Sequence, residues 1–148
     1  MGYWLLKSEP TVYSLGDLQK QGTTIWDGVR NYQARNFLKQ MHLGDRAFFY
    51  HSNTKIPGIV GIMKVVKTLV VDPTQFDPKS DYFDPKSTPE QPRWMTVELE
   101  FVEMFPKILP LETLKQLFTS EELLLVKKGN RLSVMPISET VAKKILEL

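Results

Sequence analysis

The chain has 148 residues, of which 42% are hydrophobic and 24% are charged, as in an ordinary globular protein with a sizeable core. The net charge is only +2, which excludes a broad basic face, so any anion site must be local. Cysteine is absent, which excludes a disulfide framework, a thiolate zinc site and a cysteine nucleophile. We therefore expect residues 1–148 to form a single domain.

The first residues predict neither a secretory signal nor a membrane anchor. Met1–Leu6 lacks a basic start, and its apolar run stops at Lys7. No apolar run approaches the length that spans a membrane. The expected location is the cytoplasm, or the nucleus in a eukaryote, with no membrane partner.

The N-terminal quarter predicts two strands separated by a short helix. Tyr3–Lys7 is an apolar strand, and Pro10 breaks the ladder after it. Ser14 is placed to cap a helix through Lys20, and Thr23–Trp26 is a second short strand.

A longer helix is predicted after Asn31, which can cap it. Ala34, Phe37, Leu38 and Met41 recur at the spacing of an amphipathic helix. The helix start is therefore a loop-to-helix junction, where unpaired backbone N–H groups favour anions.

The middle of the chain predicts two strands and a long loop. Arg46–Ser52 is rich in aromatic residues, and Gly58–Asp72 is rich in β-branched residues. Gly61 inside the second strand marks a bulge or a close backbone approach. The loop Pro73–Arg93 holds five prolines and two similar turns, and Tyr82 with Phe83 is expected to anchor it.

Trp94–Phe105 has the clearest strand alternation in the sequence. The apolar parity changes in its second half, which predicts a bulge near Phe101. The alternation predicts Val97 and Leu99 as buried and Glu98 and Glu100 as exposed.

The C-terminal third predicts a helix after Pro110, a capping box of Thr119 with Glu122, a strand Arg131–Met135 and a helix Ser138–Leu148. The apolar residues expected to face inward from the last helix are Val141, Ile145 and Leu148. Six strands and four or five short helices without βαβ alternation favour an α+β fold with a small, mostly antiparallel barrel.

Residues 26–36 mix an aromatic ring, a carboxylate, a glycine, two arginines and two asparagines. Trp4 lies in an apolar strand and is expected in the core, whereas the polar neighbours of Trp26 favour a position at a binding site. Arg30 beside Trp26 suits a stacked base or a phosphate, although a solvated surface arginine has the same pattern.

Catalysis is not supported by any motif. His51 and His42 have no metal-site spacing, and His51 is interpreted as a structural or hydrogen-bonding residue. Ser8, Ser52 or Ser133 could form a triad with His51 and Asp27, but GxSxG is absent. Walker and GxGxxG motifs are also absent, so no cofactor is expected.

The stretch WDGVRNYQARNFL resembles the signature of the EVE domain family, in particular its thymocyte nuclear protein branch. Six further blocks match in the order of the family, so the resemblance covers nearly the whole chain. Lys127 stands where the family commonly has an arginine, so a bidentate contact is not carried over to that position. The further blocks are Tyr3–Pro10, Gly44-Asp45 with Phe49–Asn53, Pro57–Gly61, Tyr82–Pro85, Pro92–Trp94 and Arg131–Pro136.

The resemblance implies a PUA-like, mixed but mostly antiparallel β-pseudobarrel surrounded by short helices. It also implies a cleft that holds nucleic acid with a modified base, which would stack on Trp26 and be read by Asn31 and Ser8. Arg30, with Lys7 or Arg131, would meet the phosphate. The full set of implied site residues is Lys7, Ser8, Trp26, Val29, Arg30, Asn31, His51, Ser52, Arg131 and Ser133.

The functional prediction is a non-catalytic, monomeric module that binds a modified base in DNA or RNA. A pocket for a small anionic metabolite or a free modified nucleoside is the first alternative, and an enzyme acting on a nucleobase is the second. A base reader binds oligonucleotides with a salt dependence, whereas a metabolite pocket is stabilised by its ligand and an enzyme turns a substrate over.

Overall fold

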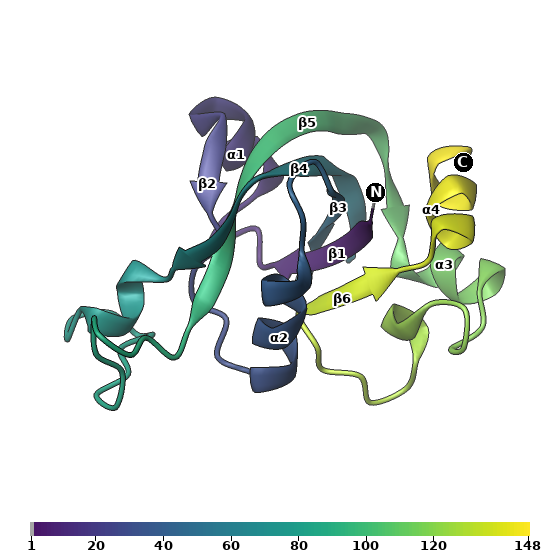
Figure 1. Ribbon diagram of the computed structural model, residues 1–148. Coiled ribbons are helices and arrows are strands. Elements are labelled where there is room, and N and C mark those ends of the chain that lie inside the picture. The colour runs from purple at the N-terminus through teal and green to yellow at the C-terminus, as the bar shows by residue number, and fades with distance from the viewer. Residues whose placement is uncertain (1) are drawn as a thin grey trace.

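The computed structural model describes residues 2–148, which form one curved, six-stranded sheet with helices around it (Figure 1). The spatial order is β2-β5-β4-β3-β1-β6. β1 runs parallel to β3, and the other four neighbouring pairs of the described chain are antiparallel, so the predicted fold class is confirmed. The strands are β1 (Tyr3–Ser8), β2 (Thr23–Ile25), β3 (Arg46–His51), β4 (Gly58–Val71), β5 (Met95–Pro110) and β6 (Val134–Ile137).

The sheet curls but does not close. Its edge strands are β2 and β6, and within residues 2–148 they are not paired with each other. Figure 1 shows β5 arching over one side of the molecule while β6 crosses the other, with β1, β3 and β4 between them. An open pseudobarrel therefore keeps two strand edges free to border a pocket.

The described residues form four α-helices and two 3₁₀ helices. Figure 1 shows α1, α2, α3 and α4 placed around the sheet. The predicted caps are present: Ser14 forms a capping box with Asp17, Asn31 Oδ1 accepts the Ala34 N–H, and Ser138 Oγ accepts the Val141 N–H. Within residues 2–148, no helix has the length and apolar character that crossing a membrane requires. The helices are α1 (Leu15–Gln21), α2 (Tyr32–Gln40), η1 (Pro73–Phe76), α3 (Leu111–Leu117), η2 (Leu124–Val126) and α4 (Glu139–Leu146).

β4 and β5 form a long antiparallel ribbon with several register shifts. Met63 faces Phe101 and Ile62 faces Glu103, so Val102 is the extra residue and the predicted bulge is confirmed. The close approach of the two strands also explains why residue 61 is a glycine, because a Cβ there would collide with the backbone carbonyl of Glu103.

The predicted alternation in β5 is confirmed for its buried side. Val97 and Leu99 are fully buried, but Glu98 and Glu100 are only half-exposed instead of exposed. The two carboxylates are covered in part by lysines of β4, which lie across the ribbon: Lys67 Nζ is 4.0 Å from Glu98 and Lys64 Nζ is 3.5 Å from Glu100.

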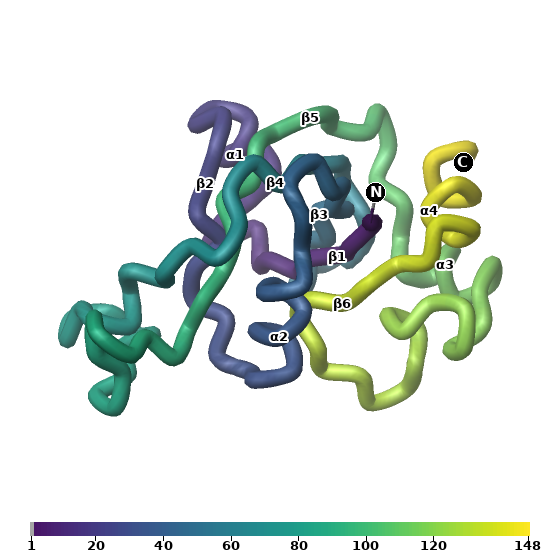
Figure 2. The backbone as a smooth tube through the Cα atoms, viewed as in Figure 1, coloured from purple at the N-terminus to yellow at the C-terminus, as the bar shows by residue number. Residues whose placement is uncertain are grey.

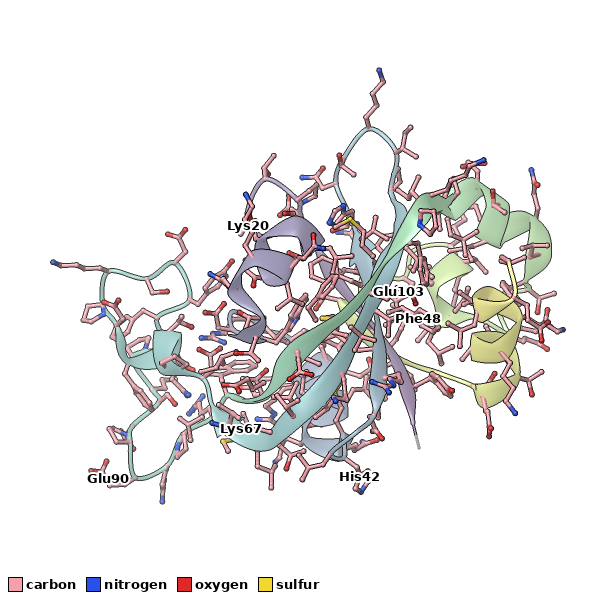
Figure 3. All side chains as sticks on the ribbon, turned by 90° about the horizontal axis from the view of Figure 1, so that it is seen from above. Lys20, His42, Phe48, Lys67, Glu90 and Glu103 are labelled. Atoms are coloured by element: carbon pink, nitrogen blue, oxygen red, sulfur yellow. The ribbon has the colours of Figure 1, made fainter. Side chains whose placement is uncertain are left out.

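The loop between β4 and β5 has little regular structure beyond η1, as predicted, and Figure 2 shows it projecting to one side of the sheet. Its predicted anchors are wrong, since Tyr82 and Phe83 are 38% and 39% exposed. The buried side-chain amide of Gln75 anchors the loop instead. Its Nε2 donates to the carbonyls of Asp72 and Trp94, and its Oε1 accepts from Ser87 Oγ and from the Trp94 N–H.

Two C-terminal predictions need correction. β6 begins at Val134 instead of Arg131, because the ladder with β1 starts at Leu6 opposite Val134. Arg131 and Ser133 therefore lie in the segment that leads into β6. Leu148 is 65% exposed, because α4 ends at Leu146 and only the earlier residues of its apolar stripe reach the core.

The start of β1 is fastened to the turn before β3 by a buried carboxylate. Asp45 is 3% exposed and accepts hydrogen bonds from the Gly2 N–H at 2.9 Å, Trp4 Nε1 at 2.9 Å and the His42 N–H at 3.0 Å. Trp4 is buried in the core beside Phe37 of α2, as predicted.

Candidate functional site

A pocket of about 730 Å³ lies between the two open edges of the sheet. Residues of β2 and of the segment leading into β6 border it, together with the end of β1. This volume is typical of small-ligand pockets. The lining residues are Lys7, Ser8, Glu9, Val12, Tyr13, Gln21, Thr24, Ile25, Trp26, Asp27, Gly28, Val29, Arg30, Ser52, Tyr82, Arg131 and Ser133.

Backbone hydrogen bonds join three distant segments beneath this pocket. The Lys7 N–H donates to the Ser133 carbonyl at 2.8 Å, and the Ser52 N–H donates to the Ser8 carbonyl at 3.0 Å. The sequence prediction that these four residues gather at one cleft agrees with this geometry, since all four line the pocket.

Lys7 brings a positive charge to the pocket without a neutralising partner. Within residues 2–148, no carboxylate lies within 4.0 Å of its Nζ, which instead sits 5.9 Å from the centre of the Tyr50 ring. Burial lowers the pKa of the Lys7 ammonium below its ordinary value. An anionic or hydrogen-bond-accepting ligand would relieve this cost.

Trp26 lines the pocket but belongs mainly to the core. It is 7% exposed, the same as Trp4, and its ring meets the edge of Phe49 at a centroid distance of 5.4 Å. Its backbone is bound to β5 on both sides, through its N–H to Val97 and its carbonyl to Thr96 Oγ1. Trp26 therefore lies at the predicted cleft and is at the same time a core residue, so only a small part of its ring is open to the pocket.

Arg30 is a structural hub, and its N–H groups are not free for a phosphate. Nε and Nη2 donate to the Tyr82 carbonyl, and Nη2 also reaches Thr74 Oγ1. Nη1 donates to the Val29 carbonyl and to Asp72 Oδ2, each about 3 Å away. The guanidinium also stacks over Trp94, 5.0 Å from the ring centre. The five N–H donors of the fork are thus all engaged.

Asn31 and His51 do not line the main pocket. Asn31 uses its Oδ1 to cap α2 and borders a second hollow. His51 Nε2 accepts the Leu15 N–H at 3.2 Å, and the imidazole packs edge-on against Phe49. Burial lowers the pKa of His51, which favours the neutral ring that this hydrogen bond requires. His51 therefore holds the start of α1.

The serine, histidine and aspartate residues that could form a catalytic triad are not brought together as one. Within residues 2–148, no serine is hydrogen-bonded to His51, and Ser8 Oγ donates to the Tyr13 carbonyl at 2.6 Å. In the same part of the chain, no group of three or more His, Asp or Glu residues is placed to hold a metal ion.

The pocket walls are shaped in part by three residues that were not predicted as site residues: Tyr13, Gly28 and Tyr82. Tyr13 comes from the turn before α1, and its hydroxyl donates to Gln21 Oε1 at 2.6 Å. Gly28 has φ +84°, and a Cβ there would lie 2.7 Å from the Tyr82 ring, so only glycine fits this wall. The glycine inside the signature was the available signal, whereas Tyr82 comes from a loop whose position no local pattern predicts.

A second, shallower hollow of about 350 Å³ adjoins the first, and Arg131 borders both. Lys127, Lys128 and Arg131 are exposed there, and within residues 2–148 none of them is paired with a carboxylate. Asn130 fixes the turn that carries them by donating to the Leu124 carbonyl and accepting from the Leu132 N–H. The remaining lining residues are Asn31, Gln33, Leu124, Gly129, Asn130 and Leu132.

The fold and the site together define a single class of structure, an open, mostly antiparallel α+β pseudobarrel with a polar pocket beside a basic hollow. The family model that matches it is "EVE domain", over residues 2–148. The chain belongs to the EVE domain family, which confirms the resemblance found in the sequence.

Relatives of known name support this assignment over nearly the full chain. Mouse thymocyte nuclear protein 1 is 43% identical over 164 residues, covering 99% of this chain and 73% of the relative. A crystal structure from Pseudomonas putida has a TM-score of 0.94 and 48% identity, covering 98% of this chain and 97% of the other. Human THYN1 protein, solved in complex with DNA containing 5-methylcytosine, has a TM-score of 0.92 and 40% identity, covering 99% of this chain and 96% of the other. The Mmi1 YTH domain shares only the fold, with a TM-score of 0.54 and 12% identity.

Proposed function

We propose that this protein is a non-catalytic, nucleic-acid-binding module that holds a modified base in the main pocket, with 5-methylcytosine in DNA as the first ligand to test. The observation that carries the proposal is the pairing of a polar pocket that is large enough for a base with an adjoining basic hollow through Arg131. The human relative solved with DNA containing 5-methylcytosine supports the same ligand class.

The base enters between the edges of the open sheet and meets polar groups from several segments. Ser8, Ser52 and Ser133 supply hydroxyls near the floor, and Lys7 supplies an unpaired cation. Tyr13 and Tyr82 are the more accessible aromatic walls, because Trp26 offers only a small part of its ring. Stacking on aromatic faces and hydrogen bonds to the base edge together suit an extruded base.

The phosphates next to the base meet the basic hollow. Lys127, Lys128 and Arg131 are exposed and lack carboxylate partners in the described chain, whereas Arg30 is fully engaged within the protein. Such contacts provide affinity and orientation without reading sequence.

The test is equilibrium binding of matched oligonucleotides with either cytosine or 5-methylcytosine at one position, in single and double strands. We expect binding to at least one form, with tighter binding of the methylated strand. Equal affinity for the two bases in both strand forms contradicts the modified-base proposal. A free nucleoside that stabilises the protein thermally while no oligonucleotide binds would favour the metabolite alternative. Chemical conversion of the bound base would favour the enzyme alternative.

Two further properties stay predictions. A monomer is expected, and binding stoichiometry with light scattering tests it. The cytoplasm, or the nucleus in a eukaryote, remains the expected location and is tested by microscopy of the tagged protein.

A further inference from the structure

Asp27 presents the one carboxylate of the main pocket that no other residue of the described chain satisfies. The other pocket carboxylate, Glu9, accepts a hydrogen bond from Asn53 Nδ2. Asp81, on the outer loop, also accepts no hydrogen bond from residues 2–148, but it lies outside the pocket lining. Hydrogen bonds from the protein reach the carboxylates of Asp17, Asp45, Asp72, Asp77 and Asp84.

The backbone around Asp27 is held on both sides. Trp26 is bound to β5 through its N–H and its carbonyl, and the Gly28 N–H donates to Asp72 Oδ2 at 2.8 Å. The Asp27 N–H donates to the Ile25 carbonyl at 2.9 Å. A side chain on such a fixed backbone is positioned in advance for a ligand.

Asp27 is an exposed residue, so its carboxylate is open to solvent as well as to the pocket that it lines. Burial, followed by the nearby Asp72 carboxylate, raises the pKa of Asp27, although Arg30 and the Asp27 N–H act in the opposite direction. Tyr13 lines the same pocket, and burial, with smaller contributions from the Asp17 and Asp27 charges, raises its pKa. A donor from a ligand would therefore take the place of solvent at this carboxylate, without displacing a hydrogen bond from another residue.

We propose that Asp27 determines base specificity by accepting a hydrogen bond from the exocyclic amino group of the bound base, so that the pocket selects amino pyrimidines over keto pyrimidines. This inference rests on the proposed function, because it needs a base in the pocket. A carboxylate that accepts from the cytosine amino group is a known mode of base recognition.

Thymine provides a stringent comparison because it shares the 5-methyl group and the 2-keto group of 5-methylcytosine. The two bases differ at position 4, where 5-methylcytosine carries an amino donor and thymine carries a keto acceptor. An ionised carboxylate has only acceptors, so one of its oxygens would face the thymine keto oxygen without a proton between them. An amide at position 27 has a donor and an acceptor and can match either base.

The experiment measures the affinity of the parent protein for oligonucleotides that differ only in one base, 5-methylcytosine or thymine. We expect the parent to prefer 5-methylcytosine by about tenfold or more, as one good base-edge contact provides. Asp27→Asn should bring that ratio close to one, mainly by improving thymine binding. Asp27→Ala should also remove the preference, but by weakening 5-methylcytosine binding.

Asp81→Asn is the matched control, because it removes the same charge from an exposed aspartate outside the pocket. It should keep the parent's ratio. Circular dichroism confirms that each variant is folded, and Asp27 has no protein contact to lose through its carboxylate. An unchanged ratio in both Asp27 variants overturns this inference while oligonucleotide binding by the parent leaves the proposed function intact. Absence of binding by the parent to any oligonucleotide overturns both.

Discussion

Arg30 shows how a residue in a binding signature can serve the site without touching the ligand. Its guanidinium fastens the wall of the pocket to Asp72 and to the Tyr82 carbonyl in the loop between β4 and β5. The planar fork of arginine can reach these partners at once, whereas the ammonium of lysine cannot. Arg30 therefore sets the position of Tyr82, which lines the pocket.

At the same scale, Trp26→Ala is predicted to act first on stability. Trp26 is 7% exposed and packs against Phe49, so the truncation should lower the free energy of unfolding by about 3–5 kcal/mol. Phe83→Ala is the control, because this ring is 39% exposed and its loss should cost less than about 1 kcal/mol. Urea unfolding measures both variants. Similar losses in the two would show that Trp26 is a surface platform after all.

Individual side-chain roles were the least predictable part of the site. The family resemblance named Lys7, Ser8, Ser52, Arg131 and Ser133 as site residues, and all five line one pocket. Whether a given arginine or tryptophan faces solvent or protein depends on partners far away in the sequence, such as Asp72 for Arg30. No local pattern carries that information.

At the scale of elements, the attachment of β1 depends on the buried Asp45 carboxylate. Burial pushes the pKa of Asp45 up, but hydrogen bonds from the His42 N–H, Trp4 Nε1 and the Gly2 N–H outweigh it and bring the pKa below its ordinary value. A lowered folded-state pKa means that this stabilisation is present above the unfolded-state value of about 3.9 and is lost as the pH falls through the folded-state value.

Asp45→Asn is therefore predicted to lower stability at pH 7 by about 1–3 kcal/mol, because an amide cannot satisfy the same three donors. Below pH 4, the gap between parent and variant should narrow. Denaturant unfolding from pH 7 to pH 2 measures this, with Asp81→Asn as the exposed control. A gap that stays constant with pH would contradict the role assigned to the ionised carboxylate.

Elements were predictable where the signal is local. The caps at Ser14 and Asn31 and the apolar stripe of α2 each depend on residues close together in the sequence, and they were confirmed. The alternation in β5 is equally local, and it was confirmed for the buried side of the strand. β6 was misplaced because it is a short edge strand whose start is set by its pairing with β1. The anchor of the long loop was missed because Gln75 acts through two backbone segments that are distant in sequence.

At the scale of the whole molecule, the small net charge means that contacts with phosphates depend on a local group of cations. The net charge is +2, and the three exposed cations that adjoin the main pocket are those of the second hollow. Three phosphate contacts predict that the logarithm of the binding constant falls with the logarithm of salt concentration with a slope of about −2 to −3.

Arg131→Gln should make that slope shallower by about one unit and weaken methylated and unmethylated strands alike. Arg30→Lys keeps the charge, so it should leave the slope unchanged while lowering stability, because the fork of hydrogen bonds is lost. Lys107→Gln, on the exposed outer part of β5, is the control that should change neither. Binding titrations at several salt concentrations decide between these outcomes.

The position of β1 between β3 and β6 has a consequence for folding during synthesis on the ribosome. β1 lies about 130 residues ahead of β6 in the chain, so its second edge stays unpaired until β6 is synthesised. The pocket also needs Ser133 and Arg131, so it cannot exist on a partial chain. The complete pocket lining is therefore present only after the segment that leads into β6 has been synthesised.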